Sequence, residues 1–160
     1  MYEPPDWLPP LVCLADYGGE WNRYVNEVFA LFHRDFIQSQ PKFEGRWVRC
    51  RRDPLYDGKE AGFWHCVQEG ADEEQRTPDL RRCERVGWIR AVIEHPADRR
   101  VEKWRAHKGH EYRTYLWLGE EYLVVLGERG GYYQLITAFC TDRDHTIRKL
   151  RRERDASRNG

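Results

Sequence analysis

Residues 112–140, YRTYLWLGEEYLVVLGERGGYYQLITAFC, contain the clearest strand pattern in the chain. Three runs rich in β-branched and aromatic residues, at 112–118, 121–129 and 132–140, have the length and composition of strands. Between the last two runs, Gly130 and Gly131 are typical of a two-residue hairpin turn. The stretch therefore predicts antiparallel strands late in the chain.

Two segments outside this stretch also have strand-like patterns. Residues 88–96, WIRAVIEHP, are rich in apolar and β-branched side chains, which favours a further strand. Residues 43–51, FEGRWVRCR, alternate in a way that predicts a strand or an edge hairpin with its arginines outward. We therefore expect an antiparallel sheet of four or more strands.

Four helices are expected around and between these strands. Residues 20–37 repeat aromatic and β-branched side chains at helical spacing, which predicts a helix with one buried face. A short helix is expected at 59–69. Another begins at 77–86, TPDLRRCERV, where Thr77 can cap, Pro78 suits the first helical position and Asp79 complements the helix dipole. The charged tail at 144–156 predicts a helix anchored by Ile147 and Leu150.

The predicted organisation of the chain is one domain over residues 1–160, because this length supports one hydrophobic core. A proline-rich arm at 1–18 precedes a mainly helical part at 20–90, which includes the strand or hairpin at 43–51. The antiparallel sheet follows at 88–140 and the C-terminal helix at 144–156. Helices followed by an antiparallel sheet define an α+β fold.

Composition excludes several classes of protein. Lysine plus arginine and aspartate plus glutamate each number 27, so any attraction of nucleic acid must come from local patches. The five cysteines form no CxxC pair, which argues against a disulfide framework or a zinc site and favours the cytoplasm. The sequence has no signal-peptide pattern, no membrane-spanning run and no phosphate-loop or GxSxG motif. We expect no membrane partner, metal or cofactor.

Residues 58–70, GKEAGFWHCVQEG, contain the first candidate for catalysis. On a helix, His65 has the small residues Ala61 and Gly62 on one side and the carboxylate of Glu69 on the other. Space beside the imidazole and a carboxylate partner suit a general acid or base. A half-buried, hydrogen-bonded and inert histidine is the alternative.

Arginines on the next predicted helix form a second candidate site. Arg81 and Arg85 lie one turn apart and can present two guanidinium groups, with Arg82 between them, which suits a phosphate. The alternative is an ordinary solvated helix face.

The predicted sheet brings further candidates to one face. A turn at Gly130–Gly131 pairs Arg129 with Tyr132 and Val124 with Thr137, so the Thr137 hydroxyl would share a face with Tyr133. Threonine is also common in strands for steric reasons alone. On the preceding strand, Arg113, Tyr115 and Trp117 share a face that could stack on bases, or these aromatic rings belong to the core.

Residues 59–155 resemble the superfamily of nucleases that includes barnase, EndoU, colicin D and RelE, and its phage-associated branch. The resemblance rests on Phe63, Trp64 and His65 at a helix end, a basic helix, and the hairpin YLVVLGERGGYYQLITAF at 122–139. The last aromatic residue, Phe139, stands where that superfamily has tyrosine.

The resemblance implies an antiparallel sheet whose open face cleaves RNA without metal, leaving a 2′,3′-cyclic phosphate. His65 would be the base or acid, Thr137 would contact the phosphate, and Arg113 would be the catalytic cation, with Arg82 and Arg129 as alternatives. The second acid or base is open among Tyr115, Tyr133 and His95. The predicted substrate-binding residues are Arg81, Arg82, Arg85, Arg129, Tyr115 and Tyr133.

The predicted partner is RNA, with tRNA as one candidate. A toxin-like nuclease would also have a neutralising antitoxin or immunity protein. The alternative function is a non-catalytic RNA-binding or protein-binding module on the same scaffold, since a fold does not determine a function.

Overall fold

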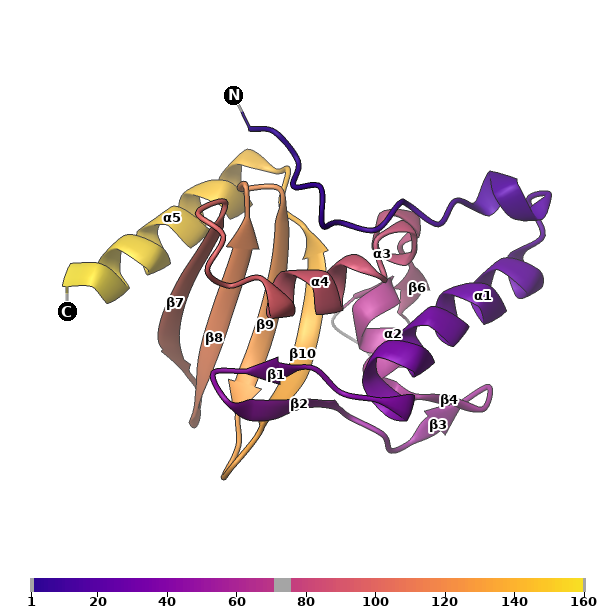
Figure 1. The fold of residues 1–160 in the computed structure, drawn as a ribbon, viewed down its shortest axis with the longest axis horizontal. Helices are drawn as coiled ribbons and strands as arrows, with labels where there is room; N and C mark the ends of the chain where they lie inside the picture. The colour runs from indigo at the N-terminus through magenta and orange to yellow at the C-terminus, as the bar shows by residue number, and fades with distance from the viewer. Residues whose placement is uncertain (1, 71–75, 160) are drawn as a thin grey trace.

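The computed structural model describes residues 2–70 and 76–159 (Figure 1). Helices dominate the first part of the chain and long strands the second, before a final helix. The elements in chain order are the 3₁₀ turn η1 (Leu14–Tyr17), α1 (Trp21–His33), the π-helical turn η2 (Arg34–Gln38), β1 (Lys42–Phe43), β2 (Arg46–Cys50), β3 (Leu55–Tyr56), β4 (Lys59–Glu60), α2 (Ala61–Val67), β5 (Gln68–Glu69), β6 (Thr77–Pro78), α3 (Leu80–Glu84), α4 (Trp88–Glu94), β7 (Val101–Lys108), β8 (Glu111–Leu118), β9 (Tyr122–Glu128), β10 (Tyr133–Cys140) and α5 (Asp144–Asn159).

Within the described residues, six strands form one sheet in the order β1-β2-β10-β9-β8-β7. Neighbouring strands are antiparallel apart from β2 and β10, which run parallel where Val48–Cys50 pairs with Tyr133–Leu135. The expected α+β fold, with helices, an antiparallel sheet of four or more strands and a C-terminal helix, is confirmed. The parallel pair is a feature that the sequence did not indicate.

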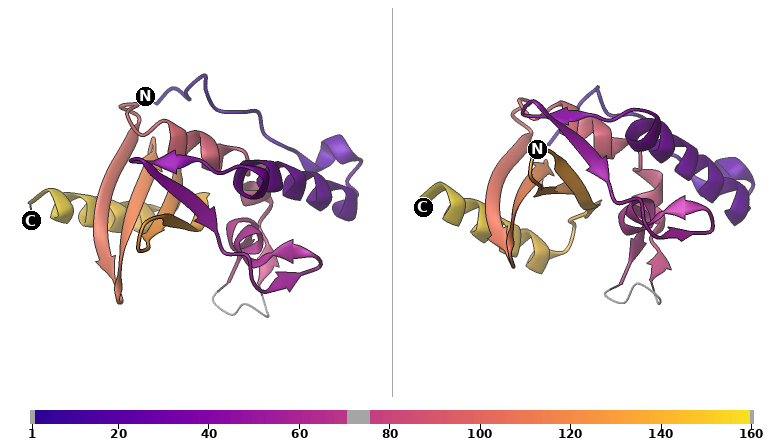
Figure 2. Two further views of the ribbon diagram at one scale, coloured as in Figure 1. Left: turned by 60° about the horizontal axis from the view of Figure 1, so that its bottom comes forward. Right: turned by 90° about the horizontal axis from the view of Figure 1, so that it is seen from below.

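Helices cover both faces of the sheet, which explains why its central strands are so apolar. α1 and α4 lie on one side and α5 on the other (Figures 1 and 2). On β8 and β9, Leu116 and Val124 face the core shared with α1 and α4, whereas Trp117 and Leu123 face the core beneath α5. A strand buried on both faces reads as a continuous hydrophobic run, as 122–126 does.

The helix expected at 20–37 is α1 followed by η2. Its buried side chains recur at three-residue and four-residue intervals, so they form one stripe against the larger core. These side chains are Tyr24, Val25, Val28, Phe32 and Phe36. The proline-rich arm packs on the same core through Trp7, Leu8 and Leu14.

The prediction of a strand at 88–96 is wrong, so the sheet does not begin at residue 88. This segment is helix α4, and its buried residues are Trp88, Ile89, Val92 and Ile93. Their spacing marks one helical face, and burial of that face outweighs the strand preference of the isoleucines and valine. The missing strand is β7 at 101–108, which forms a hairpin with β8.

The hairpin register predicted for β9 and β10 is correct at its start and wrong beyond the middle. Tyr133 pairs with Glu128 as expected, but Thr137 pairs with Val125 rather than Val124 because a β-bulge lies between Leu135 and Thr137. An extra residue in one strand moves the following side chains to the other face. Thr137 therefore lies near Phe139 on the α5 side, while Tyr133 and Leu135 belong to the opposite core.

Element boundaries differ elsewhere by a few residues. The segment at 43–51 is the hairpin of β1 and β2, and the tail helix runs to residue 159. The helix expected from Thr77 begins at Leu80, because the Asp79 side chain accepts hydrogen bonds from the amides of Arg81 and Arg82. Asp79 is thus the N-cap, a position that aspartate favours.

Gly62 allows α2 to approach the end of β2. A Cβ at this position would lie 2.8 Å from both the backbone nitrogen and the backbone oxygen of Arg51. The Gly62 amide also donates a 2.7 Å hydrogen bond to the Arg51 carbonyl. This close contact fixes the place of the helix that carries His65.

We expect Gly62→Ala to lower the free energy of unfolding by about 1–3 kcal/mol, because a Cβ between backbone atoms forces the helix away from β2. The usual gain from alanine in a helix, about 0.5–1 kcal/mol, is smaller. Urea denaturation measures the difference. The matched control is Gly130→Ala, since no atom lies within 4 Å of a Cβ there. Equal stability of the two variants would contradict this account.

Candidate active site

α2 packs beside the second half of β10, beyond the point where β2 leaves the sheet edge. Thr137 makes the link, because its Oγ1 donates a hydrogen bond of 3.1 Å to the main-chain carbonyl of His65. The β-bulge of β10 places this hydroxyl on the α5 side of the sheet. Thr137 and His65, to which the resemblance gave roles in one site, are therefore neighbours, but the contact joins a hydroxyl to a backbone carbonyl.

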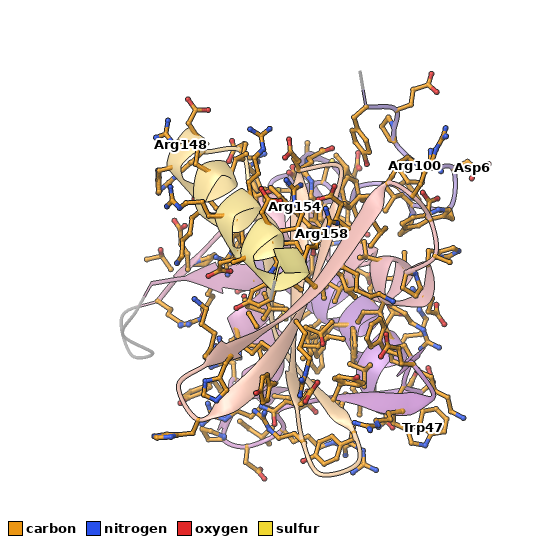
Figure 3. The ribbon with its side chains drawn as sticks, turned by 90° about the vertical axis from the view of Figure 1, so that its left-hand side faces the viewer. Asp6, Trp47, Arg100, Arg148, Arg154 and Arg158 are labelled. Atoms are coloured by element: carbon orange, nitrogen blue, oxygen red, sulfur yellow. The ribbon has the colours of Figure 1, made fainter. Side chains whose placement is uncertain are left out.

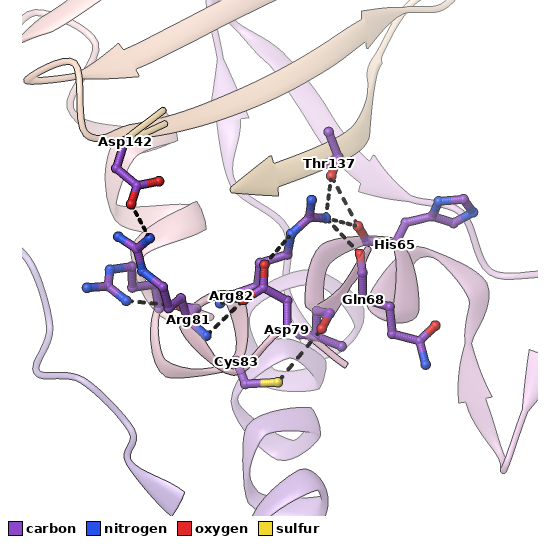
Figure 4. A network of polar contacts seen from close by, with 10 residues as sticks. His65, Gln68, Asp79, Arg81, Arg82, Cys83, Thr137 and Asp142 are labelled. Carbon is purple, nitrogen blue, oxygen red and sulfur yellow. Dashed lines mark hydrogen bonds and ion pairs between the residues drawn. The ribbon is translucent and has the colours of Figure 1, made fainter. Parts of the chain in front are cut away.

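Arg82 on α3 also contacts both the end of α2 and Thr137 of β10 (Figure 4). Its Nη1 lies 2.7 Å from the Gln68 carbonyl oxygen, 3.4 Å from that of His65 and 3.5 Å from Thr137 Oγ1. Its Nε lies 3.3 Å from a carboxylate oxygen of Asp79. Because carbonyls at a helix C-terminus lack partners within the helix, this guanidinium group satisfies the end of α2.

Arg82→Ala should therefore destabilise the protein by about 1–3 kcal/mol, the usual result of leaving partly buried acceptors without a donor. Thermal or urea unfolding tests this expectation. Arg81→Ala is the control, because Arg81 forms an exposed ion pair with Asp142 and such pairs contribute about 1 kcal/mol or less. A larger loss in the Arg81 variant would argue against Arg82 as the structural link.

The imidazole of His65 points away from Thr137 and Arg82 (Figure 4). His65 lines a pocket of about 220 Å³ between α2 and the strands, which we call the His65 pocket, and also a smaller one of about 180 Å³ beside Tyr56 and Trp64. The residues that line the His65 pocket are Arg51, Gly62, His65, Glu111, Arg113, Arg129, Gln134, Leu135 and Ile136. The structure thus brings His65 together with Arg113 and Arg129, two of the three predicted cations.

Glu111 lies between these two arginines. Arg129 Nη1 donates to its Oε2 at 2.5 Å, and Arg113 Nη2 donates to its Oε1 at 3.2 Å. Gly127 makes room for the first contact, because a Cβ on it would lie 2.7 Å from both Arg129 Nη1 and Glu111 Oε2. Burial raises the pKa of Glu111, but the two guanidinium groups outweigh burial and lower this pKa below its ordinary value. The carboxylate is therefore ionised at neutral pH.

Charge in the His65 pocket favours an anion. The charged residues among the described residues that line it are three arginines, Arg51, Arg113 and Arg129, and one carboxylate, that of Glu111. Leaving the imidazole out of the count, these side chains carry two net positive charges. Guanidinium groups bind phosphate through paired hydrogen bonds, so the pocket has the chemistry of a phosphate site with an imidazole and a carboxylate beside it.

The remaining predicted residues divide between a second hollow and other parts of the structure. Thr137, Arg113 and Tyr115 line a hollow of about 450 Å³ beneath α5. Tyr133 lies in the opposite core, 5.3 Å from the ring of Phe43, so its predicted role in substrate binding is not supported by its position.

Arg81 and Arg85 do not form the predicted pair of phosphate ligands. Arg81 turns to Asp142, whereas Arg85 contacts Glu84 and the Arg81 carbonyl. The two guanidinium groups thus have separate partners. The structure therefore gives no sign of the paired arrangement, and their predicted role in substrate binding stays a prediction.

Among the residues named as a possible second acid or base, none lines the His65 pocket, whereas Glu111, which the sequence did not single out, does. Burial raises the pKa of both Tyr115 and Tyr133, so neither phenol is a base near neutral pH. His95 stacks on Trp7 at 4.2 Å, and both pack with the α4 side of the fold. Glu111 and Arg113 lie two residues apart on one strand face, a spacing that could have revealed their pairing.

The described residues contain neither a cluster of metal-binding side chains nor a helix that could span a membrane. No group of three or more histidine, cysteine, aspartate or glutamate side chains within 2–70 and 76–159 could hold a metal ion. In the same part of the chain, every helix is too short or too polar to cross a bilayer.

Comparisons with protein families, curated proteins and solved structures find no match for this chain.

Proposed function

We propose that this protein is an endoribonuclease that needs no metal and leaves a 2′,3′-cyclic phosphate. The observation that carries the proposal is the His65 pocket, which a histidine, an ionised carboxylate and three arginines line together. Cleavage of RNA by its own 2′-hydroxyl requires a base, an acid and positive charge around the phosphate. The pocket supplies all three from side chains.

The roles follow from the charge of each group. Ionised Glu111 accepts the proton of the ribose 2′-hydroxyl as the 2′-oxygen forms a bond to phosphorus. The bond from phosphorus to the 5′-oxygen of the next nucleotide breaks, and protonated His65 gives its proton to that oxygen. Arg113 and Arg129, joined by Arg51, stabilise the negative charge that develops on the phosphate oxygens. The products are a cyclic phosphate end and a free 5′-hydroxyl end.

Other predicted residues have supporting roles in this proposal. Thr137 and Arg82 hold α2 in place, so they position His65 without contacting the reacting atoms. Single-stranded RNA and the loops of tRNA are the proposed substrates, because their backbone can enter a pocket that a duplex cannot. We propose a cytoplasmic location and a neutralising partner protein as further parts of a toxin-like function.

Incubating the purified protein with single-stranded RNA and total tRNA in EDTA tests the proposal. We expect fragments ending in 2′,3′-cyclic phosphate, which acid treatment opens to terminal phosphate groups. A matched DNA should remain intact because it lacks the attacking hydroxyl. Cleavage of the DNA, or cleavage that EDTA abolishes, would overturn the mechanism.

A non-catalytic binding module is the second candidate function, and one observation favours it. Glu111 already forms hydrogen bonds with both Arg113 and Arg129, so it competes with a phosphate for these groups. Intact RNA that nevertheless binds with strong dependence on salt would select this function over catalysis.

A further inference from the structure

A second hollow lies next to the His65 pocket, on the same face of the sheet. It has a volume of about 450 Å³, and we call it the α5 groove. The residues that line this groove are Lys108, Arg113, Tyr115, Leu123, Val125, Thr137, Phe139, His145, Thr146, Lys149, Leu150 and Glu153. Arg113 also lines the His65 pocket, so a chain bound at one site can continue directly into the other.

The α5 groove combines an apolar floor with a cationic rim. Phe139 contributes a partly exposed aromatic ring, and the largely buried side chains of Tyr115, Leu123, Val125 and Leu150 complete the apolar floor. Lys108, Arg113 and Lys149 contribute positive charge around them. Flat apolar surfaces beside cations are the features by which proteins hold the bases and phosphates of single-stranded nucleic acids.

Lys149 differs from the other cations of α5 that approach the sheet. Arg151 forms an ion pair with Glu120, and Arg154 forms one with Glu102 of β7. Lys108 on the groove rim is likewise paired, with Glu153 at 2.7 Å. Within the described residues, Lys149 forms no ion pair or hydrogen bond, although it is exposed and lines the groove. Its ammonium group is therefore available to a phosphate.

We infer that the α5 groove binds the nucleotide next to the cleaved phosphate of a single-stranded RNA. The base lies over the apolar floor, and Lys149 contacts the adjoining backbone phosphate. This inference rests on the proposed ribonuclease function and specifies its substrate. Between Ile136 in the His65 pocket and Phe139 in the groove, β10 rises about 10 Å at about 3.3 Å per residue. A ligand that occupies both sites is thus an oligonucleotide with unstacked bases.

Arg148 provides a matched control for Lys149. The two residues are adjacent on α5 and both are exposed, but Arg148 does not line the groove. Figure 3 shows α5 crossing the strands, with Arg148 near its start and Arg154 close to the sheet. Reversing the charge of either residue changes the net charge equally, so a difference between them reports on the groove itself.

Fluorescence anisotropy with a 2′-O-methyl RNA of about 12 nucleotides tests the inference, because this length suits single-strand binders and the ligand cannot be cleaved. We expect Lys149→Glu to weaken binding by roughly 10-fold and to reduce the salt slope by about 1, the effect of losing one phosphate contact. Arg148→Glu should weaken binding by about 2-fold or less, through screened long-range attraction only. Thr146→Trp should weaken binding by filling the groove, whereas Arg148→Trp should not.

The two proposals fail in different ways in this experiment. If the groove variants bind like the Arg148 variants while natural RNA is still cleaved, the groove inference is overturned and the ribonuclease function stands. If natural RNA stays intact but Lys149→Glu and Thr146→Trp lose binding, the groove holds RNA and catalysis is overturned. If the wild-type protein does not bind the oligonucleotide, the groove is assigned to a different occupant, such as a segment of a partner protein.

Discussion

Replacing His65 by alanine is expected to slow RNA cleavage by roughly 100-fold to 10,000-fold, the usual cost of removing a positioned acid or base. The imidazole lines the pocket that holds the arginines, so its loss removes proton transfer to the leaving oxygen. Binding of RNA should change little, because the arginines that attract phosphate remain. Single-turnover cleavage in EDTA measures the rate, and anisotropy with uncleavable RNA measures binding.

Two further variants make this experiment specific. His65→Gln keeps a polar side chain that cannot carry a proton near neutral pH, so it should be as slow as His65→Ala. His107→Ala is the matched control, because His107 is exposed and contacts Tyr112 away from the pocket. Cleavage by His65→Ala at the wild-type rate would remove this residue from the mechanism and point to a different acid or to a contaminating nuclease.

The C-terminal hairpin shows how far local sequence patterns reach. Two apolar runs around Gly130 and Gly131 predict paired strands, and Tyr133 does pair with Glu128. The pattern does not reveal the β-bulge at Ile136, because an extra residue in an apolar strand leaves its composition unchanged. That single residue decides which face Thr137 occupies, and so its contact with α2.

The sequence pattern predicted a strand where α4 lies and no strand where β7 lies, and both mistakes have the same physical origin. Apart from Arg90, residues 88–93 are apolar and include β-branched side chains, which favours a strand by propensity, yet the spacing of the buried ones suits one helical face. β7 shows the reverse case. Its many charged residues do not look like a strand in the sequence. In the fold they are stabilised by surface ion pairs, such as Lys103 with Glu44 and Arg105 with Glu128. Tertiary context decides both segments.

The candidate site could be predicted only in part for a similar reason. His65 stands out because small residues and a carboxylate surround it in the sequence, and Arg113 stands out beside aromatic residues. Arg129 and Glu111 are 18 positions apart and Arg51 lies on another strand end, so only the folded sheet brings them to one pocket. Arg51 and Glu111 were therefore missed, whereas Arg81 and Arg85, which are close in sequence, turn to separate partners.

Glu111 also makes the site sensitive to pH. Its folded pKa lies below its unfolded value of about 4.3, because Arg129 and Arg113 favour the ionised form despite burial. A depressed carboxyl pKa stabilises the folded state at any pH above the unfolded pKa, and this stabilisation is lost as pH falls through the folded value. The contribution is therefore complete at neutral pH and is lost in acid, as the pH falls from the unfolded pKa through the lower folded pKa.

Glu111→Gln should reduce RNA cleavage by roughly 100-fold or more, because the amide cannot accept the 2′-hydroxyl proton while Arg113 and Arg129 remain to bind phosphate. It should also lower the free energy of unfolding at pH 7 by about 1 kcal/mol or less, since the ion pairs are partly exposed. Urea denaturation at a series of pH values should show this difference shrinking towards zero in acid. Glu120→Gln loses a comparable ion pair, with Arg151, outside the pocket, so it should match Glu111→Gln in stability but cleave RNA at the wild-type rate. Equal loss of cleavage in both variants would assign the effect to folding, and normal cleavage by Glu111→Gln would exclude this carboxylate as the base.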